Sequence, residues 1–241
     1  MRILITNDDG INSKSLLELA KWASKHGEVT VCAPKVEQSG KSHGIEIFKP
    51  FEIKKVDLDH AFEAYSVDST PADCVRFGIL GLKREYDVVI SGINKGYNMG
   101  KDIIYSGTVG AIFEAAGFGH KAIALSTCVS GFDAALSNLD AVFAYLDKHN
   151  LMNIHNLYNI NIPCEVKGDI RITHIGKACY SDAFMALDND MYKQYGDFVF
   201  YDTNDLTLDT DCIMHGYISI TPLTFERTDM VMFNKLKELN N

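Results

Sequence analysis

The stretch YDVVISGINKGYNMGKDIIYSGTVGAIFEAAG, residues 86–117, joins a strand-like run to a helix-like run through a long loop. YDVVISG (86–92) is the most continuous β-forming run in the chain, as in a strand buried on both faces of a parallel sheet. The pattern of TVGAIFEAAG (108–117) predicts a helix. The eighteen residues 91–108 between them exceed what a connection requires, so the stretch predicts a strand, a functional loop and a helix.

The same alternation of strand and helix extends to both sides of this stretch. Predicted strands lie at 2–6, 28–34, 121–127 and 158–163, and predicted helices at 12–27, 70–82 and 133–149. We therefore expect an α/β fold, a mostly parallel, Rossmann-like, three-layer αβα sheet. IEIFKPFEIKKV (45–56) alternates around Pro50, which predicts a β-hairpin or an edge ribbon lying off the main sheet, and AFEAYSV (61–67) could add another strand.

Residues 1–241 are expected to form one domain, with a core over about 1–163 and an irregular, β-rich oligomerisation extension over about 164–241. No linker or internal repeat divides the chain. The polar stretch 180–211 carries no usable motif.

Composition excludes several classes of protein. The net charge is −9 and no Lys/Arg-rich run is present, which argues against polymeric nucleic acid as a partner. No stretch has the pattern of a membrane span or signal peptide, so a soluble, cytoplasmic protein is expected. The six cysteines form no CxxC pair and resemble reduced core thiols rather than a disulfide framework or zinc site: Cys32, Cys74, Cys128, Cys164, Cys179 and Cys212.

NDDG (7–10) places two carboxylates directly after the first predicted strand. Asp8 and Asp9 can converge on one point if the strand ends in a turn at Gly10. A divalent cation would stabilise both as anions, whereas without it one would be driven to take up a proton. The alternative is a simple Asp-Gly turn in which Asp9 caps the following helix.

The loop KVEQSGKSHG (35–44) contains GKS but is not a P-loop. Lys35 stands where the first P-loop glycine is needed, and the residues that follow alternate as a strand rather than open a helix. Ser39 and Gly40 could approach a ligand closely, or they could form an ordinary exposed turn.

The third loop, 91–108, offers neutral oxygen ligands and a helix start, although its glycines do not match GxGxxG. Asn94 and Asn98 could bind a ligand or hold the turn. Ser106, Gly107 and Thr108 could bind an anion at the helix terminus or serve as its cap. Oxygen-only donors favour Mg²⁺, Mn²⁺ or Ca²⁺ over zinc, and a cation beside an anion site suggests phosphoryl chemistry.

The motifs ILITNDDGI, APKVEQSGKSHGI, STPADCV, DVVISGINKGYNMGKDIIYSGTVGAIFEA and GYISITPL, in this order, closely resemble the SurE (survival protein E) family of metal-dependent 5'-nucleotidases. The resemblance covers nearly the whole chain. It implies one divalent metal ion, Mg²⁺ or Mn²⁺, held by Asp8, Asp9, Ser39 and Asn94.

The same resemblance implies a phosphate subsite at Asn98, Ser106, Gly107 and Thr108, which would act separately from the cation ligands. It implies hydrolysis of nucleoside 5'-monophosphates, with 3'-monophosphates and short polyphosphate as further substrates. A homodimer or homotetramer with an exchanged C-terminal extension is also implied. NSKS (12–15) and Ser69 depart from the family pattern at no metal ligand, which bears on loop shape and substrate preference.

Catalysis is expected to depend on Asp8, Asp9 and Asn98, with either carboxylate orienting the attacking water. His43 could protonate the leaving oxygen or could be an ordinary surface or core histidine. The alternative function is a non-catalytic sensor that binds a nucleotide or phosphate at the same site.

Overall fold

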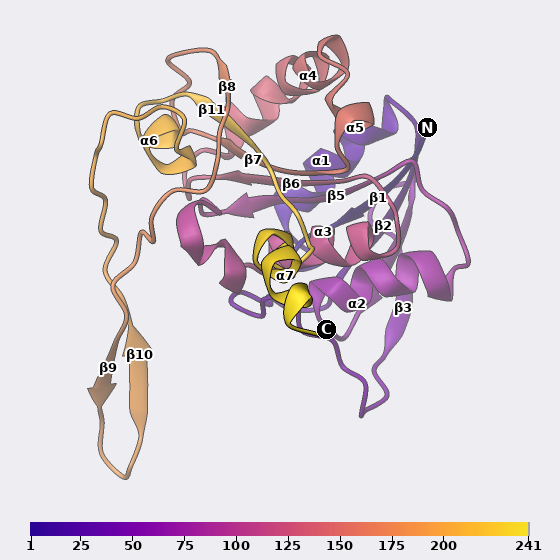
Figure 1. The fold of residues 1–241 in the computed structure, drawn as a ribbon. Coiled ribbons are helices and arrows are strands. Elements are labelled where there is room, and N and C mark those ends of the chain that lie inside the picture. The colour runs from indigo at the N-terminus through magenta and orange to yellow at the C-terminus, as the bar shows by residue number, and fades with distance from the viewer. Residues whose placement is uncertain (241) are drawn as a thin grey trace.

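The computed structural model describes residues 1–240, which are built around a nine-stranded sheet. The strand order is β3-β4-β2-β1-β5-β6-β7-β11-β8 (Figure 1). The strands are β1 Arg2–Thr6, β2 Glu28–Pro34, β3 Ile53–Val56, β4 Glu63–Val67, β5 Val88–Lys95, β6 Ala122–Thr127, β7 Leu157–Ile162, β8 Ile170–Ile172 and β11 Ile218–Pro222. Six neighbours from β4 to β7 are mutually parallel, whereas β3 and β11 run antiparallel to β4 and β7.

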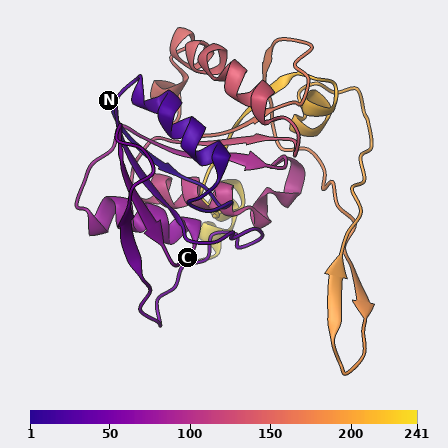
Figure 2. The same cartoon turned by 180° about the vertical axis from the view of Figure 1, so that it is seen from behind.

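Helices cover both faces of this sheet, which confirms the predicted three-layer fold. Helices α1 and α4 pack on one face and α2 and α3 on the other (Figures 1 and 2). The helical elements are α1 Lys14–Ser24, α2 Pro71–Arg76, η1 Phe77–Gly81, η2 Gly100–Tyr105, α3 Gly107–Gly117, α4 Phe132–Lys148, α5 Leu151–Ile154, α6 Asp209–Met214, α7 Met230–Leu236 and η3 Lys237–Asn240.

The two-residue period of the strands explains why both faces need a helical layer. In β1, Ile3 and Ile5 join the hydrophobic cluster under α1 and α4, whereas Leu4 joins the cluster under α2 and α3. All three side chains are buried, so each face of the central strand carries part of the core. The carboxyl ends of the parallel strands therefore meet at one edge, where a ligand can be reached by several loops.

The predicted ribbon is confirmed only in part, because it lies in the main sheet and not off it, and its first half forms no strand. Strands β3 and β4 extend the main sheet at its edge, and residues 45–52 contain no strand. The carboxylate of Glu46 accepts hydrogen bonds from the N–H groups of Phe48 and Lys49, at 2.8 and 3.1 Å. This local turn uses backbone donors that a hairpin would need for pairing.

A ribbon is present elsewhere, in the stretch to which the sequence assigned no role. Strands β9 Ala183–Ala186 and β10 Tyr192–Tyr195 form an antiparallel hairpin that projects from the body of the molecule (Figure 1). Strands β8 and β11 also follow Pro163, and both lie in the main sheet. The C-terminal third therefore completes the sheet as well as forming the projection.

The expectation of reduced cysteines is wrong for one pair. Cys128 and Cys164 form a disulfide, with Cα atoms 5.7 Å apart, although 36 residues separate them in sequence. They follow β6 and β7, neighbouring parallel strands whose ends lie together. The remaining four are buried free thiols, as predicted: Cys32, Cys74, Cys179 and Cys212.

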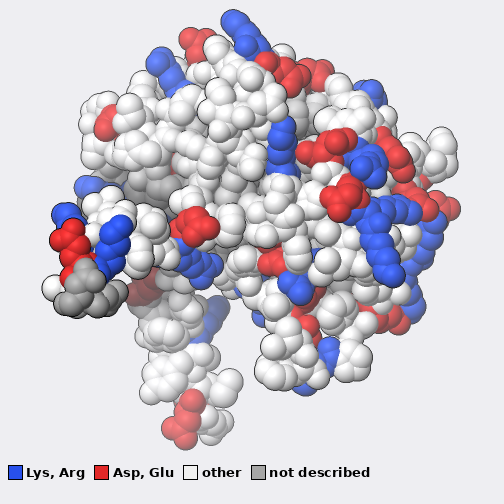
Figure 3. All heavy atoms as spheres, turned by 45° about the vertical axis from the view of Figure 1, so that its right-hand side comes forward, with Lys and Arg blue, Asp and Glu red and all other residues white. Residues whose placement is uncertain are grey.

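Charged side chains of both signs are intermixed on the face displayed in Figure 3. Near β3 and β4, for example, the Lys35 ammonium lies 3.1 Å from a carboxylate oxygen of Asp68, and the Arg84 guanidinium lies 2.8 Å from Glu63. Across residues 1–240, no helix combines the length and the apolar character that crossing a membrane would require.

Candidate active site

The turn after β1 positions the paired carboxylates. The Asn7 side chain closes this turn, because its amide donates to the Gly10 carbonyl at 3.1 Å and its oxygen accepts from the Gly10 N–H at 3.2 Å. Gly10 has a φ of +99°, a conformation that favours glycine. Asp8 and Asp9 thus lie at the carboxyl edge of the sheet, as NDDG predicted.

Asp8 points at the first turn of α3. Its carboxylate accepts the Thr108 hydroxyl at 2.7 Å and the Thr108 backbone N–H at 3.2 Å. A Cβ on Gly107 would come within 3.1 Å of the Asp8 Cβ, so the glycine permits this approach. Thr108, predicted from the sequence to belong to the phosphate subsite, therefore contacts a predicted cation ligand, and the separate action of the two sets of residues stays a prediction.

Both carboxylates are destabilised as anions in the absence of a bound positive charge. The pKa of Asp8 is raised to about 6, because burial and the neighbouring Asp9 carboxylate, which raise it, outweigh the hydrogen bonds from Thr108, which lower it. Burial also raises the pKa of Asp9. One Asp9 oxygen, Oδ2, is buried without a hydrogen-bond partner among the described residues.

The end of β5 carries Asn94, and the loop that follows it carries Asn98. Strand β5 runs on to Lys95, so this loop is shorter than the sequence indicated. The Asn94 amide donates to the Gly96 carbonyl at 2.8 Å, which leaves its side-chain oxygen available to a ligand. The Asn98 amide donates to the Ser126 hydroxyl at 2.9 Å.

Two residues that sequence reasoning missed hold Asn98 in place. Asn159 and Asn161, both on β7, donate their side-chain amides to the Asn98 carbonyl at 2.8 and 2.7 Å. The Asn161 oxygen also accepts the Asn98 N–H at 3.0 Å. Both asparagines are fully buried. Their alternation in YNINIP was a usable signal, because buried amides in a central strand require dedicated partners.

Ser39 reaches the same region from the loop after β2. The neighbouring Gln38 N–H donates to the Asp8 carbonyl at 2.7 Å, which ties this loop to the NDDG turn. The Ser39 hydroxyl donates to Glu37 at 2.6 Å.

At the start of α3, the Ser106 hydroxyl oxygen accepts the Val109 N–H at 3.1 Å. This oxygen therefore caps the helix, which is the alternative that the sequence left open beside anion binding.

A cavity of about 320 Å³ joins most of these groups. Five of the eight predicted site residues line it: Asp8, Ser39, Asn94, Asn98 and Ser106. The other three, Asp9, Gly107 and Thr108, adjoin it, since Asp9 follows Asp8 and the start of α3 contacts Asp8. The far wall contains groups from the base of the β9–β10 hairpin, which the sequence did not predict.

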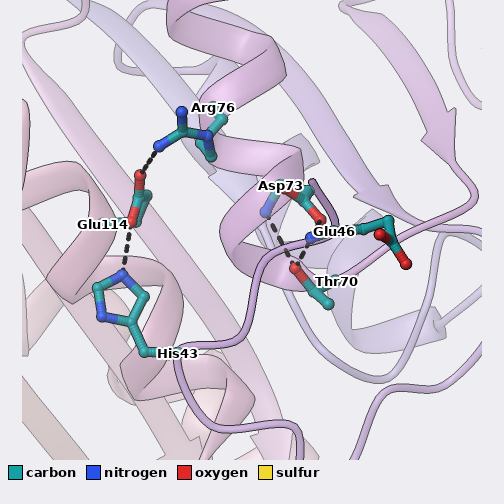
Figure 4. A network of polar contacts seen from close by, with 6 residues as sticks. All are labelled: His43, Glu46, Thr70, Asp73, Arg76 and Glu114. Carbon is teal, nitrogen blue, oxygen red and sulfur yellow. Dashed lines mark hydrogen bonds and ion pairs between the residues drawn. The ribbon is translucent and has the colours of Figure 1, made fainter. Parts of the chain in front are cut away.

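His43 is placed by a different network, drawn in Figure 4. Its Nε2 lies 2.6 Å from Glu114, whose other oxygen accepts from Arg76 at 2.6 Å. Burial alone would raise the Glu114 pKa, but the hydrogen bonds from His43 and Arg76 outweigh it, so this pKa lies below its usual value. Because His43 does not line the cavity, the structure supports the interpretation of His43 as an ordinary surface or core histidine rather than as a proton donor to the leaving oxygen.

The donor set fits a hard divalent cation. Both carboxylate pKa values are raised, even though the Lys95 charge lowers that of Asp9, and the Asp9 Oδ2 has no hydrogen-bond partner among the described residues, so a bound cation would stabilise both anions. Within residues 1–240, no three His, Cys, Asp or Glu side chains gather as a metal cluster, so amide and hydroxyl oxygens must complete any ligand set here. Such oxygen donors suit Mg²⁺ or Mn²⁺.

Comparison with known proteins places this site in context. The family model described as Survival protein SurE matches residues 3–182. Proteins described as 5'-nucleotidase SurE from Thermoanaerobacter sp. (strain X514) and Alkaliphilus metalliredigens (strain QYMF) are 38% and 40% identical. The alignments cover 98% and 100% of this chain and 97% and 99% of those relatives.

A solved structure agrees with the same assignment. The crystal structure of the SurE protein from Aquifex aeolicus matches with a TM-score of 0.81 and 29% identity, and the match covers 100% of both chains. Family model, full-length relatives and fold point the same way, and the chain belongs to the SurE family.

Proposed function

We propose that this protein is a metal-dependent phosphomonoesterase that hydrolyses nucleoside 5'-monophosphates to nucleoside and phosphate. Nucleoside 3'-monophosphates and short polyphosphate are further substrates on this proposal. Full-length relatives described as 5'-nucleotidase SurE support it. The observation that carries it is the contact of Asp8 with the first turn of α3, which sets a carboxylate pair against a helix N-terminus.

Asp8, Asp9, Ser39 and Asn94 are the proposed ligands of one Mg²⁺ or Mn²⁺ ion. Bound there, the ion supplies the positive charge that polarises a phosphoryl oxygen and acidifies a water molecule. Thr108 keeps the Asp8 carboxylate oriented through two hydrogen bonds. Its hydroxyl therefore supports the proposed cation site through Asp8, next to the proposed phosphate contacts.

Asn98, Ser106 and Gly107 are the proposed direct phosphate contacts. The Gly107 N–H lies in the first turn of α3, where a helix offers no carbonyl partner, and the Ser106 hydroxyl lines the cavity. The positive end of the helix dipole favours an anion at this position. Asn159 and Asn161 hold the Asn98 backbone, and the Ser126 hydroxyl accepts a hydrogen bond from the Asn98 side-chain amide, so Asn98 is positioned before substrate arrives.

Asp9 is the proposed group that orients the attacking water, because its Oδ2 is buried and has no hydrogen-bond partner among the residues that the structure describes. The alternative is a non-catalytic nucleotide sensor at the same site. The sensor would bind AMP without releasing phosphate.

The test is phosphate release from AMP by the full chain, with Mn²⁺ or Mg²⁺ and with a chelator. Asp9→Asn is expected to lose most activity, whereas the matched control Asp188→Asn, an exposed carboxylate in the β9–β10 hairpin, should retain it. Binding of AMP by the wild type without phosphate release under every metal condition would favour the sensor.

We also propose a homodimer or homotetramer. Helix α7 exposes apolar side chains, including Val231 at 69% and Phe233 at 48% of their maximal areas. A second subunit could cover them.

A further inference from the structure

Two aromatic side chains form part of the cavity wall, at the base of the β9–β10 hairpin. Tyr180 and Phe198 both line the cavity that Asp8, Asn98 and Ser106 also line. They face each other across an isolated antiparallel bridge, with ring centroids 5.7 Å apart and ring planes at 72°. Tyr180 is 53% and Phe198 46% exposed, so about half of each side chain remains open to contact.

The base of the hairpin is fixed to the loop that carries Asn98. The Cys179 N–H donates to Asp102 of η2 at 2.6 Å. The fully buried Asp209 accepts the Gly100 N–H at 3.0 Å and the Gly176 N–H at 2.7 Å, which joins the two segments through one carboxylate.

Gly100 allows these two segments to approach closely. Its φ is +60°, and a Cβ there would collide with the Lys177 carbonyl oxygen. The Val199 N–H donates to the Cys179 carbonyl at 2.7 Å and closes the hairpin base next to the two rings. The aromatic pair is therefore held in a fixed relation to the proposed phosphate contacts, unlike the exposed strands farther along the hairpin.

We propose that Tyr180 and Phe198 form the nucleobase platform of the active site. The proposal rests on the proposed function. A nucleoside monophosphate is an anion at one end and a flat aromatic ring at the other, and the cavity offers polar donors on one wall and half-exposed rings on another.

Stacking on aromatic side chains accepts every base, because each base has a π-face, and it strengthens with ring area. The platform therefore selects nucleotides over base-free phosphomonoesters and purine over pyrimidine nucleotides. It contributes to binding of the substrate and not to the chemical step.

The experiment compares AMP with ribose 5-phosphate, which keeps the sugar and phosphoryl group but lacks the base. Tyr180→Ala and Phe198→Ala are each expected to lower kcat/KM for AMP about 5- to 150-fold, mainly through KM, which is the usual range for loss of one stacking contact. Hydrolysis of ribose 5-phosphate should stay unchanged. Tyr180→Phe should restore the wild-type ratio, since it keeps the ring.

Phe184→Ala is the matched control, because Phe184 is an exposed aromatic on β9 that does not line the cavity. It should leave both substrates unaffected. The wild type itself provides a measurement independent of mutant folding, since it should prefer AMP to ribose 5-phosphate by a factor within the same range.

Equal losses for AMP and ribose 5-phosphate would overturn the platform and assign the rings a structural role. Unchanged kinetics with AMP, or a wild type that hydrolyses both substrates equally well, would overturn it too. Failure of the wild type to hydrolyse either substrate with any metal would instead refute the phosphomonoesterase function.

Discussion

Replacing Asp8 by asparagine should stabilise the metal-free protein while abolishing its activity. Burial raises the Asp8 pKa from 3.8 to about 6, roughly two units, which corresponds to about 3 kcal/mol at 1.36 kcal/mol per unit. The folded-state pKa lies above the unfolded one. The contribution of Asp8 to stability is therefore present below about pH 4 and lost as the pH rises through about 6.

Asparagine carries no charge and escapes this loss, but it cannot accept both Thr108 hydrogen bonds at oxygen. That deficit offsets the gain by about 1 kcal/mol, which leaves about 2 kcal/mol of net stabilisation at neutral pH. For a chain of this size the expected rise in Tm is roughly 4–8 °C.

Thermal unfolding of wild type and Asp8→Asn, each with a chelator near pH 4 and near neutral pH, measures the effect. The stabilisation should appear only at neutral pH. Added Mn²⁺ should stabilise the wild type and leave the variant unchanged, and the variant should release no phosphate from AMP. A variant that is no more stable than wild type at neutral pH, or equally stabilised near pH 4, would refute the account of Asp8.

Three further variants test other contacts. Gly107→Ala places a Cβ 3.1 Å from the Asp8 Cβ, and because it misplaces a catalytic group it should lower kcat/KM for AMP about tenfold or more. The control is Gly117→Ala in the same helix, whose added Cβ meets no atom within 4 Å and which should leave kcat/KM unchanged. Cys128→Ser removes the disulfide and should lower the free energy of unfolding, measured in urea, by about 4 kcal/mol. Dithiothreitol should lower the stability of the wild type and leave that of the variant unchanged. Phe233→Asp should shift the oligomer toward a monomer of 26.8 kDa in light scattering, and a wild type that is already monomeric would contradict the proposed assembly.

The sequence predicted the central fold because the relevant signals are local. Alternating strand and helix patterns, Pro71 at the start of α2 and the cap at Ser106 each depend on a few consecutive residues. In a parallel sheet the carboxyl ends of the strands lie at one edge, so the sequence alone indicated that the segments carrying Asp8, Asn94 and Asn98 converge there.

What the sequence did not reveal depends on pairs of residues far apart in the chain. The Cys128–Cys164 disulfide requires the ends of β6 and β7 to be adjacent, and no spacing rule encodes that. The bond of Thr108 to Asp8 joins residues 100 positions apart. Apart from the half-buried Ala183, the strands β9 and β10 are exposed, so they lack the apolar alternation by which half-buried strands are recognised.

The insertion of β11 between β7 and β8 governs how the chain can mature during synthesis. Until residues 218–222 leave the ribosome, β7 has β6 on one side and no β11 on the other. Its backbone N–H and C=O groups on that side would then be unpaired, and such an open strand edge can recruit strands from other chains. A nascent chain halted after β7 is therefore the form of this protein most prone to aggregate, and β11 acts late, as the strand that seals it.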